Sequence, residues 1–303
     1  MTTITTTTTP RARVSRRKTL STRYGKYWYK FRRNKLSLVG LCVIVAVAVI
    51  AIFAPYLAPY PNQTVGFFVD FPASLLHPSA AHPFGTDQFG RDMLTRVMFG
   101  FRYSLMLVVV VLSITVIPGV FLGLVAGYYV NTKLSNAIMR LADIFVAVPA
   151  LLLALSVASL LTPSAINAMM AVSLAWWPWY TRLVYSSASS IRNEDFVKAA
   201  ELVGAGPLHI MFKEILPNVL GSILTKVSLD GGWVILIGAA LSYVGLGAQA
   251  PTPDLGTMIS NGAPYLDTAW WVSIFPALAI VAVILGFNLL GDGVNDMFSS
   301  GIT

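Results

Sequence analysis

Side chains of the types that bind metal ions gather near the end of the longest polar segment of the chain, residues 59–99. They are His77, His82, Asp87 and Asp92. Imidazole and carboxylate groups are common ligands of Zn²⁺, but this spacing matches neither a helical nor a hairpin metal site, and Pro78 and Pro83 interrupt it. We therefore expect the charged side chains of this segment to pair with one another. The expected partners are Asp87, Arg91, Asp92 and Arg96.

No other stretch brings together groups that would catalyse a reaction. The sequence contains no nucleophile elbow, no phosphate-binding glycine loop and no cluster of His and carboxylate residues. We therefore do not expect the chain to be an enzyme, either as an ATPase or as an intramembrane enzyme. Its single cysteine, Cys42, excludes an intrachain disulfide.

The composition is that of a membrane protein. Of the 303 residues, 56% are hydrophobic and only 11% are charged, whereas a soluble domain of this size has about a quarter charged residues. The net charge of +8 does not indicate nucleic-acid binding, because no nucleic-acid-binding fold is recognisable and eleven of the 21 Lys and Arg lie between Arg11 and Lys35, beside the first apolar stretch. The sequence predicts an all-α polytopic membrane protein.

Six apolar stretches are long enough to cross a membrane as helices. They are residues 36–58, 103–128, 136–161, 168–185, 218–246 and 271–290. Lys and Arg are concentrated in the N-terminal arm and in the segments 133–140 and 182–226, so the positive-inside rule places both termini in the cytoplasm. We divide the chain into a basic cytoplasmic arm, residues 1–35, and a transmembrane domain, residues 36–303.

The arm contains a pattern typical of a helix that lies in the lipid headgroup region. Tyr24, Tyr27, Trp28 and Phe31 share one helical face, and Arg23, Lys26, Lys30 and Arg33 share another. The alternative is a disordered basic tail that only sets the orientation. The first span is too long for a signal peptide. One glycosylation sequon, at Asn62, falls in the external segment that follows this span.

Residues 193–217, between the fourth and fifth spans, predict a first short amphipathic helix. Asn193 is a suitable N-cap, and Glu194 lies four residues before Lys198, the spacing of a helical ion pair. An apolar stripe follows at helical spacing: Phe196, Ala199, Ala200 and Val203.

A second short helix follows a glycine turn in the same segment. Gly204 suits the left-handed residue that ends the first helix, Pro207 suits the first turn of the second, and Pro217 is expected to end it. The second apolar stripe is Leu208, Met211, Phe212 and Ile215. Such a helical pair can dock into a groove on a soluble partner. The alternative is a loop that folds only against its own chain.

Several side chains inside the expected spans are polar or aromatic. Asp230 lies near the middle of the fifth span, where an acid should face a partner or a water-filled cavity. We hold Asp230 and Trp233 as candidate pathway residues, with a role in helix packing as the alternative for Asp230. Arg140 and Asp143 are one turn apart and suited to pair. The cluster from Trp176 to Tyr180 is either an interfacial belt or a wall of the pathway.

Two motifs resemble a known family. Ala199-Ala200, Gly204 and Ile215-Leu216-Pro217 are similar to the "EAA" coupling loop of ABC importer permeases, which sits in a cleft of the ATPase subunit, although Lys198 stands at the position of the motif's glutamate. Residues 85–92, with Gly85, Thr86, Asp87, Gly90, Arg91 and Asp92, resemble the G-T-D-x-x-G-R-D signature of the "C"-type subunit in the dipeptide and oligopeptide branch.

The resemblance implies a type I ABC importer permease with six spans. It implies one half of a heterodimeric pore that pairs with a "B"-type permease, two ATPase subunits and an external solute-binding protein, with ATP and Mg²⁺ bound by the ATPase and no cofactor on this chain. The implied coupling residues are Phe196, Lys198, Ala199, Ala200, Glu201, Gly204, Leu216 and Pro217. Residues 85–92 are implied at the external mouth.

The cargo implied by the resemblance is a peptide, but related systems carry oligosaccharides or nickel. Gly238, Ala250 and Leu255 depart from the family pattern, which leaves the cargo open. An ion-coupled secondary transporter is the alternative from another class. Such a protein should have inverted-repeat halves or charged residues along several spans, and only Asp230 stands out here.

Overall fold

The computed structural model describes residues 25, 28–64 and 66–298, and its regular structure there is helical except for one isolated bridge between Thr86 and Asp92. The longer helices are α2 (Lys35–Leu57), α3 (Met93–Tyr128), α4 (Lys133–Val146), α5 (Ala150–Ser159), α6 (Ala165–Ile191), α7 (Asp195–Leu202), α9 (Leu216–Tyr243), α10 (Leu255–Gly262) and α11 (Trp271–Phe298). Shorter helical turns are η1 (Pro61–Thr64), η2 (Phe71–Ala73), α8 (Pro207–His209), the π-helical η3 (Ile210–Ile215) and η4 (Ala263–Tyr265).

Among the described residues, four continuous helices are long and apolar enough to cross a membrane, or five spans if the bent pair α4–α5 is counted as one. The four helices are α2, α3, α11 and the helix that runs from Pro207 to Tyr243. The prediction of a multi-pass all-α protein is therefore confirmed. Helix α6 is long enough to cross a membrane, but its sequence is not apolar enough to be counted among them, because its 27 residues include many Trp, Tyr and Ser side chains.

The third predicted span is not one straight helix. Helices α4 and α5 meet at an angle of 83° across a break of a few residues. Pro149 stands at the start of α5, where its missing N–H and its restriction on the preceding residue favour the end of one helix and the start of another. The prediction of a continuous helix over residues 136–161 was therefore wrong, although the proline that breaks it is visible in the sequence.

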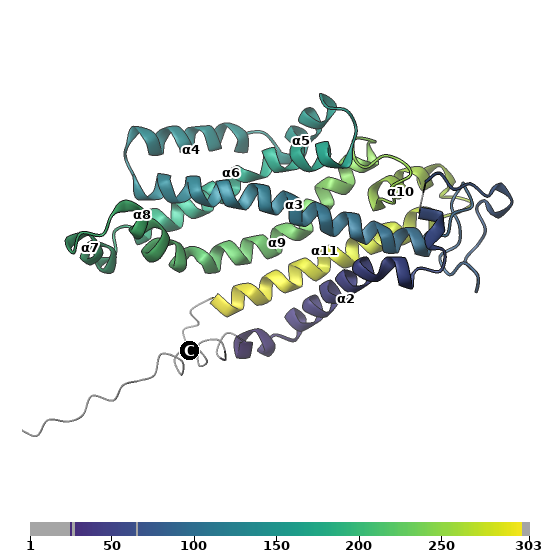
Figure 1. Ribbon diagram of the computed structural model, residues 1–303, viewed down its shortest axis with the longest axis horizontal. Helices are drawn as coiled ribbons and strands as arrows, with labels where there is room; N and C mark the ends of the chain where they lie inside the picture. Colours follow the sequence, from purple (N-terminus) through teal and green to yellow (C-terminus); the bar gives the residue numbers. More distant parts are fainter. Residues whose placement is uncertain (1–24, 26–27, 65, 299–303) are drawn as a thin grey trace, which may run out of the picture.

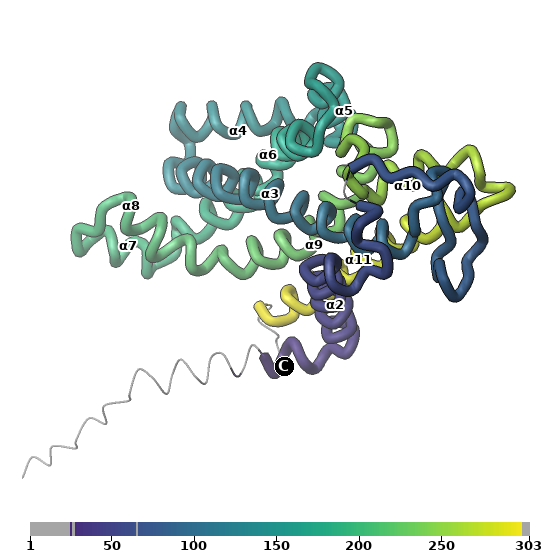
Figure 2. Tube along the Cα trace, turned by 45° about the vertical axis from the view of Figure 1, so that its right-hand side comes forward, coloured from purple at the N-terminus to yellow at the C-terminus, as the bar shows by residue number. Residues whose placement is uncertain are grey.

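The long helices lie side by side along the long axis of the molecule (Figure 1). Helices α4 and α5 cover one side of α3 and α6, and α11 and α2 lie along the opposite side, next to α9. Figure 2 shows the same order after rotation. Helices α7 and α8 lie at one end of the bundle, which we call the α7 end, and α10 lies with residues 58–92 at the other, the α10 end.

Glycines lie in the most extensive contact between two helices, which is between α3 and α6. Gly119, Gly123 and Gly127 are spaced four residues apart on α3, and each lies directly against α6. A Cβ atom on Gly123 would lie 2.7 Å from the backbone oxygen of Thr181, and one on Gly127 would lie 2.6 Å from Cβ of Ala188. Small residues at this spacing let helices pack tightly inside a membrane, where van der Waals contact drives helix association.

The start of α2 lies against the end of α11, so the two described ends of the chain are adjacent. The side-chain amide of Asn34 donates a hydrogen bond of 3.0 Å to Asp296, and Phe31 is buried beside Gly293. Residues 28–33 are helical, with Trp28 half exposed. Most of the predicted arm, residues 1–35, lies outside the described residues, including Tyr24, Lys26 and Tyr27 of the expected headgroup helix.

Candidate functional sites

The segment 85–92 at the α10 end forms a tight loop that leads into α3. Gly85 and Gly90 have positive φ angles of 70° and 78°, which glycine adopts without steric cost. The backbone of Asp70 lies directly against Gly90, which leaves no room for a Cβ atom there. Trp271 at the start of α11 donates its indole N–H to the backbone oxygen of Thr86 at 3.1 Å. The loop is therefore fixed to α11 as well as to α3.

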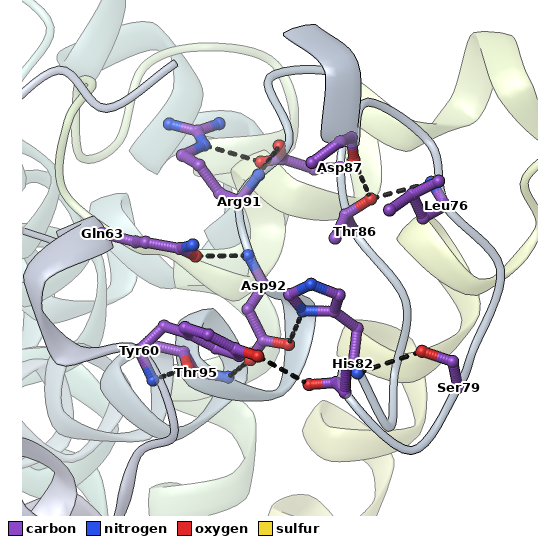
Figure 3. Close-up of polar contacts among 12 residues, drawn as sticks. Tyr60, Gln63, Leu76, Ser79, His82, Thr86, Asp87, Arg91, Asp92 and Thr95 are labelled. Atoms are coloured by element: carbon purple, nitrogen blue, oxygen red, sulfur yellow. Dashed lines mark hydrogen bonds and ion pairs between the residues drawn. The ribbon is translucent and has the colours of Figure 1, made fainter. Parts of the chain in front are cut away.

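Asp87 is the centre of a buried cluster of charges in this loop (Figure 3). Its carboxylate accepts the Nε–H of Arg91 at 2.7 Å and the backbone N–H groups of Phe89 and Arg91 at 2.9 Å each. Nε of Arg96 lies 3.6 Å from the same carboxylate. All three charged side chains are buried. The expected pairing of Asp87 with both arginines is confirmed.

Asp92 has a different partner from the one expected. It caps α3 by accepting the backbone N–H of Thr95 at 2.7 Å, and its other oxygen lies 2.9 Å from Nδ1 of His82. The ring of Tyr60 stacks on His82 at 4.9 Å between centroids, which joins the end of α2 to the loop (Figure 3). The prediction of an arginine partner for Asp92 was wrong, because capping turns its carboxylate away from Arg91 and Arg96.

The α7 end contains the segment 193–217, and the first helix of this segment, α7, begins later than expected. Helix α7 starts at Asp195 with Glu194 as N-cap, whereas the amide of Asn193 donates to the backbone oxygen of Ser189 on the preceding helix. The exposed Lys198 lies 3.6 Å from Asp195, not against Glu194. Both details of the sequence prediction were wrong, because Asn193 still belongs to the turn that follows α6.

Glu201 ties α7 to the rest of the bundle. Its carboxylate lies 2.6 Å from a guanidinium nitrogen of Arg192, and it accepts a hydrogen bond of 3.4 Å from the hydroxyl of Tyr128 at the end of α3. The guanidinium of Arg192 also lies over the ring of Tyr128, 4.8 Å from its centroid. This contact anchors α7 from within the chain.

The apolar residues of the α7 end divide into two faces. One face packs on the chain itself and includes Val197, Ile210, Met211 and Ile215, all of them buried. The other face is not fully covered by the described residues and contains Phe196, Leu202, Val203, Leu208 and Phe212. Leu202 and Val203 are 89% and 85% exposed. The predicted second stripe combines the two faces, because Met211 and Ile215 are buried whereas Leu208 and Phe212 are exposed.

The second helix of this segment does not stop at Pro217. Gly204 has the expected positive φ of 86°, and Pro207 opens α8 as predicted. From there the helix continues through the π-turns of η3 into α9, so that residues from Pro207 to Tyr243 form one helix. A wider π-turn accommodates the missing N–H and the ring of a proline. The prediction that Pro217 ends the helix was wrong.

Asp230 is buried between α9 and α6 and contacts side chains of both helices. It accepts the indole N–H of Trp176 at 2.9 Å and lies 3.1 Å from Nζ of Lys226. Trp233 is half exposed on another side of α9, so the structure does not bring these two candidate residues together. Trp176 and Tyr180 are buried in the middle of α6, a position that does not suit an interfacial belt.

Comparison with protein families identifies the chain. Residues 119–303, more than half of the sequence and including the whole α7 end, match the family described as the inner membrane component of binding-protein-dependent transport systems. The chain belongs to this family. Residues 22–78 match the N-terminal transmembrane domain of oligopeptide transport permease C. The protein is therefore a multi-pass inner membrane permease that transports rather than catalyses.

Several curated permeases are similar in sequence to this chain over most of its length. It is 40% identical over 273 residues to the di/tripeptide transport system permease protein DppC of Pseudomonas aeruginosa, covering 89% of this chain and 90% of the relative. It is 41% identical to the dipeptide transport system permease protein DppC of Escherichia coli K12, covering 89% and 91%. The glutathione transport system permease protein GsiD of Pectobacterium atrosepticum is 35% identical, covering 93% of each chain.

Sequence reasoning about the permease missed several contacts that depend on tertiary packing. Asp143 on α4 pairs with Arg182 on α6 at 2.5 Å, not with Arg140 as expected. Lys226 is the ion-pair partner of Asp230, and the i, i+4 spacing of the two residues was the available signal. Leu202 lay outside the predicted stripe, and no periodicity marked it as exposed.

Proposed function

We propose that this permease is the "C"-type half of a heterodimeric pore that imports dipeptides and oligopeptides. In this proposal an external solute-binding protein delivers the peptide, a "B"-type permease completes the pore, and two ATPase subunits bind ATP and Mg²⁺. The observation that carries the proposal is the agreement of the curated relatives, whose names specify dipeptide or di/tripeptide transport at 38–41% identity.

The proposed orientation places the α7 end and both termini in the cytoplasm. The start of α2, the α3–α4 turn before Lys133, and the segment between α6 and α9 with Arg192, Lys198 and Lys213 all lie toward the α7 end (Figure 1). This placement of Lys and Arg agrees with the positive-inside rule. Six spans then follow if α6 and the bent pair α4–α5 each cross the bilayer. The packing of α6 between α3, α4 and α9 supports its inclusion, because neighbouring helices cover its polar side chains.

The proposed contact with the ATPase is made by the uncovered apolar face of the α7 end. This face lies among the residues of the coupling motif: Phe196, Lys198, Ala199, Ala200, Glu201, Gly204, Leu216 and Pro217. Exposed leucine and valine side chains on a water-facing loop are costly unless a partner covers them. In this proposal Lys198, which is exposed and only loosely paired, approaches the ATPase, while Glu201 holds α7 to its own chain.

The proposed mechanism uses the continuous helix as a lever. Since residues from Pro207 to Tyr243 form one helix, a displacement at its start is transmitted along α9 to the α10 end. ATP-driven closure of the two ATPase subunits would then switch the permease pair between inward-open and outward-open packings. We assign the pathway-facing role to the exposed Trp233 and the packing role to Asp230, whose contact with Trp176 joins α9 to α6.

Reconstitution tests this function. The permease is purified with its co-expressed partners, inserted into liposomes with the binding protein outside and ATP inside, and assayed for uptake of labelled dialanine. We expect ATP-dependent uptake of the dipeptide and none of a labelled oligosaccharide of similar mass. Uptake of the oligosaccharide without the dipeptide, or uptake driven by an ion gradient without ATP, would contradict the proposal.

A further inference from the structure

A cavity of about 120 Å³ lies beside the buried charges of the α10 end. Its walls come from three separate parts of the chain: the external segment 67–69, the 89–96 region at the start of α3, and the segment that leads into α10. The polar side chains that line it belong to Arg91, Arg96, Thr252, Thr257 and Asn261. Two cations therefore face one small space that is open at the α10 end.

Arg96 has hydrogen-bond donors that nothing in the described part of the chain accepts. Its side chain is 5% exposed, and its Nε and Nη1 atoms are buried without a hydrogen-bond partner. The nearest carboxylate oxygen, on Asp87, is 3.6 Å from Nε and already accepts the Nε–H of Arg91 at 2.7 Å. Buried polar groups are nearly always hydrogen-bonded, so a guanidinium in this state indicates a missing acceptor.

The other acid near the cavity does not supply that acceptor. One oxygen of Asp254 accepts both the backbone N–H and the hydroxyl of Thr257, as the N-cap of α10. Burial raises the pKa of Asp254, which weakens it further as a counter-ion. No hydrogen bond between described residues occupies the side chains of Thr252 or Asn261, so both are available at the rim of the cavity. Together with the arginines they form a set of donors suited to a carboxylate.

The rim of this cavity is apolar and exposed on the side formed by residues 67–69. Phe67 and Val69 line the cavity and, with Phe71 just beyond them, are 79%, 48% and 72% exposed on a water-facing segment. Aromatic and arginine side chains are enriched in the centres of protein–protein interfaces, where a ring of apolar contacts excludes water from a charged pair. A free small anion would not need this apolar rim, so it favours an acidic side chain carried by a protein.

We propose that the cavity between Arg91, Arg96 and Asn261 receives a carboxylate side chain of the solute-binding protein when that protein docks. This inference rests on the proposed function and adds to it a residue-level docking site. The carboxylate would supply the acceptor that Arg96 lacks, and Phe67 and Val69 would cover the contact. Opposite charges across such an interface mainly increase the rate at which the two proteins associate, and this effect is greatest at low salt.

The test uses the complete transporter in lipid nanodiscs, with ATP hydrolysis measured against the concentration of cargo-loaded binding protein. Asn261→Asp puts a negative charge on the lining of the cavity while leaving Asp87, Arg91 and Arg96 unchanged, and Thr252→Asp does the same from a second lining position. Asn62→Asp is the matched control, because Asn62 is exposed at the same end of the molecule and does not line the cavity. We expect both rim variants to raise, at least tenfold, the concentration of binding protein that gives half-maximal ATP hydrolysis. The difference from the wild type should shrink at high salt, and the control variant should match the wild type.

The outcomes separate this inference from the proposed function. If the binding protein stimulates the wild type and both rim variants with the same half-maximal concentration, the docking site is wrong and the proposed function stands. If the rim variants lower only the maximal rate, the cavity acts on the cargo after docking, which also overturns the inference. A wild-type complex that no loaded binding protein stimulates would contradict the proposed function and the inference with it.

Discussion

The two ends of the permease use their side chains in opposite ways. At the α10 end the charged residues Asp87, Arg91 and Asp92 are buried and satisfy one another or the backbone. At the α7 end the apolar residues Leu202 and Val203 are almost fully exposed. Buried charge without partners and exposed apolar surface without cover both cost free energy. Among the described residues, the α10 end satisfies most of its buried charges, with Arg96 as the exception, whereas the apolar side chains of the α7 end have little cover.

This difference indicates that the charged motif near Asp87 stabilises the fold, whereas the apolar motif near Leu202 forms an interface. The charged motif near Asp87 joins the segment before α3 to α3 and α11, and its removal should affect folding first. The apolar side chains near Leu202 make few contacts with the rest of the described structure, so their removal should affect assembly first. The following predictions test this division, from the largest expected effect to the smallest.

Asp87→Ala should have the largest effect on stability. The change leaves the buried guanidinium groups of Arg91 and Arg96 without their carboxylate, a loss that typically costs about 3–5 kcal/mol. We expect a large fall in the thermal unfolding temperature of the purified protein, or no folded protein. Asp195→Ala is the control, because the Asp195 side chain is fully exposed and should not matter. An unchanged unfolding temperature for Asp87→Ala would show that the cluster does not hold the fold.

Leu202→Asp combined with Val203→Asp should disrupt assembly without disrupting folding. Losing two apolar anchors at the centre of an interface costs about 2 kcal/mol or more, so the ATPase subunits should bind at least about 30-fold more weakly. The measurement is co-purification of the ATPase together with the unfolding temperature of the permease. Leu160→Asp is a matched control, since Leu160 is 86% exposed at the far end of α5. Normal assembly of the double variant would remove the docking role of this face.

Gly204→Val should impair coupling through the backbone alone. No atom lies within 4 Å of a Cβ at Gly204, so the new side chain meets no obstacle, but the φ of 86° costs a β-branched residue about 1–2 kcal/mol. We expect ATP hydrolysis to continue while peptide uptake falls. Gly206→Val is the control, because Gly206 has equal space and a φ of −74°. Equal uptake by the two variants would contradict the assignment of this turn.

The smallest expected effect is a pH dependence at the buried acid of the α10 end. Burial raises the pKa of Asp254 in the folded protein, so folding favours its protonated form. Its burial therefore destabilises the fold at pH values above the folded pKa, and this cost is relieved as the pH falls toward the unfolded value. Relative to Asp254→Asn, the wild type should gain stability on acidification by at most about 1.4 kcal/mol per pH unit. Parallel stability curves for the two proteins would contradict this.

Much of the helical architecture could be predicted because apolar length is a direct property of the sequence. Helices α2 and α11 begin within one residue of the predicted starts of their spans, and Gly204 and Pro207 have the turn and helix-start roles expected of them. These features depend on local chemistry alone. The pairing of Asp87 with Arg91 was predictable for a related reason, since the two opposite charges are only four residues apart in the sequence.

The remaining features depend on packing between distant segments. Asp92 pairs with His82 because the loop folds back on α3, and Asp143 pairs with Arg182 because α4 lies on α6. The continuation of the helix through Pro217 depends on a π-turn that no periodicity shows. The unsatisfied guanidinium of Arg96 appears only when three segments enclose one cavity.

The most direct test of the account is cysteine crosslinking at the α7 end in the complete transporter. Leu202→Cys is introduced after Cys42→Ser, so that it is the one thiol of this chain. A short reagent that joins a thiol to a nearby lysine amine is then applied to membranes with and without ATP. The account predicts a crosslink to the nucleotide-hydrolysing subunit, and no modification of intact cells by a membrane-impermeant thiol reagent. Modification of Leu202→Cys from outside intact cells, with no crosslink to an ATPase, would contradict it.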